Sequence, residues 1–142
     1  MKNTESPFGL SEHLGLVAGA MSALAESLDR FAEESWDHPE AVPFFEECLT
    51  GLTFLDAFVE ARILYATPFS PIDTEAVSDS FASENGWLRV AALRARVTFH
   101  DETLENSLSV LADTLDDLVE YLRNRDLRPP FNEVNPETAL VA

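Results

Sequence analysis

The chain has 142 residues, a length typical of a single folded domain, and 46% of them are hydrophobic, which argues against an intrinsically disordered chain. Twenty-six acidic residues face nine basic ones, so the formal net charge is −17. Such a surface repels phosphates and attracts cations, which argues against direct nucleic-acid binding and against an anionic membrane surface. Adaptation to high salt is a competing explanation of the charge.

We expect no targeting leader, because no basic-then-apolar segment opens the sequence, and no apolar run approaches the ~18–20 residues that span a bilayer. Its single cysteine, Cys48, lies in an apolar stretch and cannot form an internal disulfide. We therefore expect a soluble cytoplasmic protein in which Cys48 is a buried, inert thiol.

Residues 1–10 are expected to be a flexible lead-in, and Ser11 is the predicted N-cap of a first helix. This helix is predicted to end before Pro39. Its apolar residues recur at alternating steps of four and three, which is a heptad seam: Leu10, Leu14, Val17, Met21, Leu24, Leu28 and Phe31.

A second helix is predicted to start near Pro43 and to end near Tyr65. It is apolar on most sides, which is typical of a central helix. Asp73 or Thr74 is the predicted cap of a short third helix, closed by Gly86.

Residues 87–99 fit both a helix and an alternating strand. We favour a helix, because no second strand is visible and an isolated strand is not stable.

Asp101 is the predicted cap of the last helix, whose leucines form a second heptad seam: Leu104, Leu108, Leu111, Leu115, Leu118 and Leu122. Residues 127–142 contain three prolines and are expected to be an extended or disordered tail. Alternatively, Pro129, Pro130 and Phe131 form a short peptide that docks in a groove.

The predicted fold is therefore all-α, a single-domain bundle of four to five helices over residues 11–126. The two seams can bury their apolar residues within the chain or against a second chain, so a homodimer through the seams is also open.

Catalysis has little support in the sequence. The three histidines are scattered, at His13, His38 and His100, and none has a glutamate three residues before it, as a helical di-iron site requires. No nucleophile, zinc or phosphate-loop motif is present. We expect no enzyme, no metal site and no cofactor.

The strongest functional feature is an acidic row on the last helix. Asp113, Asp116, Asp117 and Glu120 are spaced to lie opposite the leucines, with no basic residue between them. Four charges over about 10 Å give roughly one per 2.6 Å, close to the ~3.4 Å phosphate spacing along one DNA strand. Further acids extend this surface along the last and first helices: Glu102, Glu105, Glu26, Asp29 and Glu33.

Two interpretations of the row remain open. It is either a solvated face, or a site that binds an Arg- or Lys-rich partner protein by imitating nucleic-acid phosphates. Small acidic phage inhibitors act in the second way as a class, but no motif ties this chain to a known family. We favour an inhibitor or adaptor; the alternatives are an assembly protein built through the leucine seams and, less favoured, an enzyme.

A basic segment without acids contains Arg89, Arg94 and Arg96. These arginines are predicted to pair with carboxylates of neighbouring helices. The alternative is a secondary interface, with Trp87 as an aromatic anchor.

Overall fold

A computed structural model of the chain describes residues 9–64 and 72–127. This part contains four α-helices and no strand: α1 (Leu10–Ser35), α2 (Ala41–Val59), α3 (Thr74–Val97) and α4 (Glu102–Leu127). A π-helical turn, η1 (Glu60–Leu64), continues α2. The prediction of an all-α bundle is confirmed.

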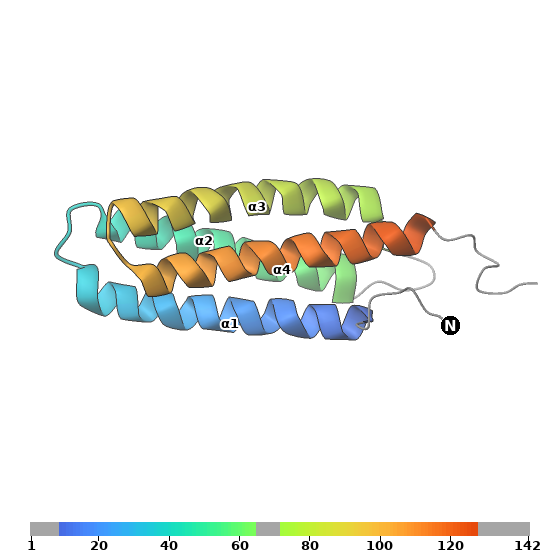
Figure 1. The fold of residues 1–142 in the computed structure, drawn as a ribbon, viewed down its shortest axis with the longest axis horizontal. Coiled ribbons are helices and arrows are strands. Elements are labelled where there is room, and N and C mark those ends of the chain that lie inside the picture. Colours follow the sequence, from blue (N-terminus) through green and yellow to red (C-terminus); the bar gives the residue numbers. More distant parts are fainter. Residues whose placement is uncertain (1–8, 65–71, 128–142) are drawn as a thin grey trace, which may run out of the picture.

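Successive helices run antiparallel, and α4 lies between α1 and α3 with α2 behind it (Figure 1). The central helix is therefore α4, and the prediction that the second helix is central is wrong, because two of its apolar residues, Leu49 and Phe54, are exposed. The hydroxyls of Ser27 in α1 and Ser107 in α4 are 2.6 Å apart, and the rings of Phe58 in α2 and Phe81 in α3 are 5.6 Å apart. Both pairs join residues far apart in sequence, as expected for an up-down-up-down bundle.

Both heptad seams are filled within the single chain. In α1, Val17, Leu24, Leu28 and Phe31 are at most 1% exposed. The six leucines of the α4 seam are fully buried. The seams are thus the core of the bundle, and a homodimer through them would require the bundle to open.

An aromatic cluster closes one end of the bundle. The Phe99 ring, just after α3, lies 4.9 Å from both Phe31 of α1 and Phe44 of α2. His100 turns the chain toward α4 with a φ of 54°, a region in which histidine is enriched among non-glycine residues.

The first helix begins at Leu10, two residues earlier than a cap at Ser11 would allow, so that predicted cap is wrong. Gly9 is the N-cap, and its backbone N–H donates to the Glu12 carboxylate at 3.0 Å. The Glu12 carboxylate accepts from the Gly9 N–H, and the His13 N–H donates to the Gly9 carbonyl at 3.1 Å, so α1 already begins at Leu10.

The predicted break at Gly86 is also wrong, because α3 continues through it to Val97. Its buried positions keep the same helical phase before and after the glycine, with Phe81 and Leu88 each at most 1% exposed. Packing against α4 outweighs the ~1 kcal/mol that glycine costs a helix interior. Residues 87–97 are helical, as favoured over a strand.

Two predicted caps are confirmed. Asp73 accepts a hydrogen bond from the Ala76 N–H at 3.1 Å, and Asp101 accepts one from the Leu104 N–H at 3.0 Å. The expected peptide Pro129–Phe131 lies outside the described residues.

Candidate protein-binding surfaces

The acidic row of α4 faces away from the core. Asp113, Asp116, Asp117 and Glu120 are all exposed, while Leu111, Leu115 and Leu118 on the opposite side are fully buried. The predicted placement of the row is therefore confirmed.

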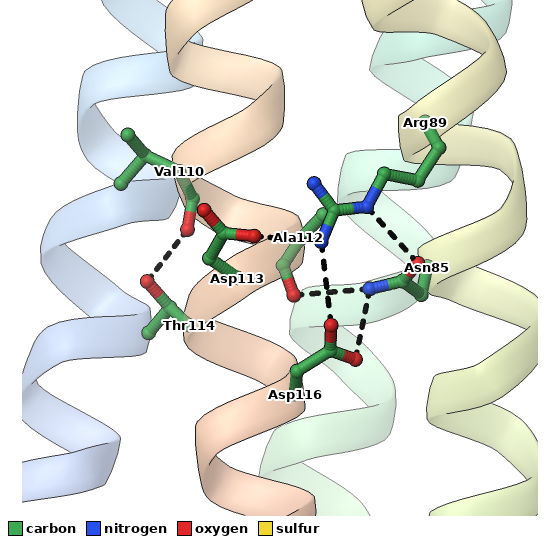
Figure 2. Close-up of polar contacts among 7 residues, drawn as sticks. All are labelled: Asn85, Arg89, Val110, Ala112, Asp113, Thr114 and Asp116. Carbon is green, nitrogen blue, oxygen red and sulfur yellow. Dashed lines mark hydrogen bonds and ion pairs between the residues drawn. The ribbon is translucent and has the colours of Figure 1, made fainter.

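Half of the row has a cationic partner on α3. A guanidinium nitrogen of Arg89 lies 2.6 Å from Asp113 and 3.3 Å from Asp116 (Figure 2). Asn85 completes the group, donating to Asp116 and accepting from Arg89. The hydrogen bond to Asp113 raises the pKa of Arg89 above its ordinary value.

The sequence shows no basic residue within the row, but the expectation that the row is not neutralised is wrong for Asp113 and Asp116, which both pair with Arg89. Arg89 lies 24 residues before Asp113 and 27 before Asp116 in the sequence, and the packing of α3 on α4 brings these side chains together. Among the described residues, no cation lies within ion-pair distance of Asp117 or Glu120.

The other two arginines of the basic segment are also paired. Arg94 lies 3.1 Å from Glu47 and 3.7 Å from Glu40, both at the α2 side, and Arg96 lies 3.5 Å from Glu105 of α4. The predicted pairing with neighbouring helices is confirmed for all three arginines. Because these pairs are exposed, each contributes only ~0–1 kcal/mol to stability.

The first helix carries the remaining predicted acids. Glu26, Asp29 and Glu33 are exposed, and the described residues offer them no ion pair. Arg30, on the same helix as these three acids, donates a hydrogen bond to Thr103 near the start of α4. The acids of α1 therefore lie nearer to Glu102 than to Glu120. Six of the predicted acids are exposed and have no ion pair among the described residues, and we call these six the acidic ridge: Glu26, Asp29, Glu33, Glu102, Asp117 and Glu120.

A groove between α2 and α3 was not predicted. It is an open groove with a volume of about 600 Å³, lined by residues of both helices that include Phe44, Gly51, Trp87, Val90 and Arg94. Two predicted secondary-interface residues, Trp87 and Arg94, thus share this groove, whereas Arg89 and Arg96 face α4.

Glycine is required where the groove is narrowest. A Cβ on Gly51 would lie 2.5 Å from the Trp87 ring, so the indole packs directly on the α2 backbone. Cys48 also lines the groove, and its burial raises the pKa of the thiol to about 12. A thiol with that pKa is almost entirely protonated at neutral pH, which fits the predicted inert cysteine.

Trp87 is anchored by a buried carboxyl. Its Nε1–H donates to Glu84 at 2.5 Å, and Glu84 is only 7% exposed. Burial raises the pKa of Glu84 above its ordinary value of 4.5, although the hydrogen bond from Trp87 opposes this shift. Ionised Glu84 therefore weakens the fold relative to its protonated form.

This shift predicts how Glu84→Gln changes stability with pH. The folded state keeps the Glu84 proton at pH values where the unfolded state has lost it. The loss of folding stability caused by Glu84 is therefore absent below pH 4.5, the ordinary pKa, and grows as the pH rises from there through the folded pKa. We expect Glu84→Gln, which can still accept the indole hydrogen bond, to gain stability over the wild type as the pH rises from 4 to 7. Urea unfolding at several pH values measures this difference, and the exposed Glu75→Gln is the control; a pH-independent difference would contradict the prediction.

The described residues contain no group of three or more His, Cys, Asp or Glu arranged to hold a metal ion, and no helix long and apolar enough to cross a membrane. Comparison with protein-family models, with curated proteins and with solved structures yielded no match to this chain.

Proposed function

We propose that this protein is a small helical binding module, an inhibitor or adaptor, whose acidic ridge engages an Arg- or Lys-rich surface of a partner protein. Among the described residues, no ion pair involves an acid of that ridge. The three arginines of α3 are paired with Glu40, Glu47, Glu105, Asp113 and Asp116, none of which belongs to the ridge.

The observation that carries the proposal is the position of Asp117 and Glu120. They lie one turn apart on the exposed side of α4, and a like-charge pair of this kind slightly destabilises a helix unless a cation is nearby. A basic partner would supply that cation. The natural class of partner is a protein surface that otherwise holds nucleic-acid phosphates, because Asp117 and Glu120 present two carboxylates about 4.5 Å apart along the axis of a rigid helix, near the ~3.4 Å phosphate spacing of one DNA strand.

The test is capture of the partner from a host extract by the tagged full chain. The ridge variant combines Glu102→Gln, Asp117→Asn and Glu120→Gln. The control combines Glu75→Gln, Asp79→Asn and Glu60→Gln, which removes the same charge from exposed positions off the ridge. Glu75 matches Glu102 closely, since each lies in the first turn of its helix.

We expect the wild type and the control to retain the same partner, and the ridge variant to bind it at least about tenfold more weakly, a difference of ~1.4 kcal/mol. Added salt should elute the partner, because exposed charges are screened, and duplex DNA should displace the chain if the site on the partner is one that binds phosphates. Equal retention by the ridge variant would refute the proposal.

A further inference from the structure

Apolar side chains are exposed where α1 turns into α2, at one end of the bundle (Figure 1). Trp36, directly after α1, is 43% exposed, and its ring lies 5.3 Å from that of Phe45 in an edge-on contact. Val42 and Leu49 of α2 are 36% and 44% exposed. We call these four residues the apolar edge: Trp36, Val42, Phe45 and Leu49. An exposed tryptophan in such a patch is typical of a protein-binding site, because the indole buries a large area when a partner covers it.

The apolar edge follows one side of α2. Val42, Phe45 and Leu49 recur at steps of three and four, so they form a stripe beside the buried Phe44 and Cys48. The stripe is about 10 Å long from its first residue to its last. A second helix presents apolar residues at i, i+3 or i+4, and i+7 over the same length.

The charge around the apolar edge is of one sign. Between Arg30 and Arg62 the chain contains eight acids and no lysine or arginine. Arg94 of α3 pairs with two of these acids, Glu40 and Glu47. Three other acids are exposed, lie within three residues of the apolar edge in the sequence, and have no ion pair among the described residues: Glu33, Asp37 and Glu46.

This charge decides which kind of molecule can cover the apolar edge. A second copy of the chain would place the same carboxylates opposite these three, and like charges facing one another oppose association. Nucleic acid and an anionic membrane are repelled for the same reason. An extended peptide cannot add as a strand, because the described residues contain no sheet to which it could pair. The chemistry that fits is an apolar helical stripe flanked by lysine or arginine.

We propose that the apolar edge docks a basic amphipathic helix of a partner protein. The apolar residues of that helix pack on Trp36 and Leu49, and its lysines or arginines meet the three flanking carboxylates. The apolar contact holds the helix in place, while the carboxylates select a basic helix over an acidic one. The apolar edge and the acidic ridge share only Glu33, so binding at one surface does not depend on the residues that carry the other.

A labelled peptide is the probe for this site. It has about 18 residues, or five helical turns, with leucines at i, i+3, i+4 and i+7 and lysines elsewhere. One control peptide has glutamate in place of every lysine, and a second has glutamine in place of every leucine. Fluorescence anisotropy with the full chain measures the three dissociation constants. We expect the leucine–lysine peptide to bind at least about tenfold more tightly than either control. Equal binding of either control peptide would overturn the proposal.

Leu49→Gln is the variant that disrupts the apolar edge. Leu16→Gln on α1 is its matched control, because the two leucines are 44% and 49% exposed. We expect Leu49→Gln to weaken binding of the leucine–lysine peptide by at least about tenfold and Leu16→Gln to leave it unchanged. Equal affinity of the two variants would overturn the proposal. Circular dichroism verifies that each variant keeps its helices.

A second pair of variants tests the edge without changing an apolar side chain. Asp37→Asn with Glu46→Gln removes two charges beside the edge, and Glu75→Gln with Asp79→Asn removes the same charge from exposed positions on α3. We expect only the first pair to weaken binding of the leucine–lysine peptide. Equal effects of the two pairs would mean that the peptide responds to net charge alone, which would contradict a site at the edge.

The ridge variant separates this site from the proposed function, because it keeps the whole apolar edge. We expect it to bind the leucine–lysine peptide with nearly the wild-type affinity. If the ridge variant lost the peptide while Leu49→Gln retained it, the peptide would bind at the ridge. That outcome would overturn docking at the apolar edge and leave the proposed role of the ridge intact.

Discussion

Replacing Leu111 with alanine is expected to lower the free energy of unfolding by about 3 kcal/mol, within the ~2–5 kcal/mol typical of a large buried aliphatic side chain. Leu111 is fully buried at the middle of α4, the helix that packs against both α1 and α3. Its removal leaves a cavity that two neighbouring helices would have to move to fill. Urea or guanidinium unfolding measures the change.

Val110→Ala is the control for this prediction, because Val110 is the next residue of the same helix but is 44% exposed. We expect it to change stability by less than about 0.5 kcal/mol, as is usual for exposed positions. Similar losses in the two variants would mean that α4 is not the central helix of the core.

Gly51→Ala is expected to destabilise the fold by about 1–3 kcal/mol, the usual range for a methyl group forced into a packed site. The added Cβ would meet the Trp87 ring at 2.5 Å, and the hydrogen bond to Glu84 holds that ring in place. This loss exceeds the gain in helix propensity that alanine brings. Unfolding followed by tryptophan fluorescence and by circular dichroism measures both the stability and the displaced indole.

Gly86→Ala provides the opposite result in the same protein. A Cβ on Gly86 meets nothing within 4 Å, so only the helix propensity changes. We expect a gain of about 0.5–1 kcal/mol. If Gly51→Ala stabilised the fold as Gly86→Ala does, the close packing of Trp87 on α2 would be wrong.

The fold was predictable because its main signals are periodic and local. The seams of α1 and α4 repeat over six or seven positions, and their leucines are the core. Gly86 misled the prediction of α3 because a glycine reads as a helix end, while the packing that carries the helix past it comes from residues distant in sequence. The Gly9 cap was missed because glycine has no capping side chain; the contact comes from Glu12, three residues later, which accepts from the Gly9 N–H.

The binding surfaces were predictable only in part. The exposure of Asp117 and Glu120 follows from their spacing relative to the leucines. The pairing of Arg89 with Asp113 and Asp116 was foreseen in kind, but which carboxylates it takes depends on the register of α3 against α4. The groove was not predicted, because it depends on Gly51 of α2 lying at the same height in the bundle as Trp87 of α3. The sequence does not specify how two helices are aligned along the bundle.

The most direct test of the ridge is its affinity for the captured partner, measured at several salt concentrations for the wild type, the ridge variant and the charge-matched control. The ridge account predicts that wild type and control bind alike, with an association rate that falls as salt rises, and that the ridge variant associates more slowly with a weaker salt dependence. An affinity that is the same for all three proteins, and unchanged between low and high salt, would contradict it.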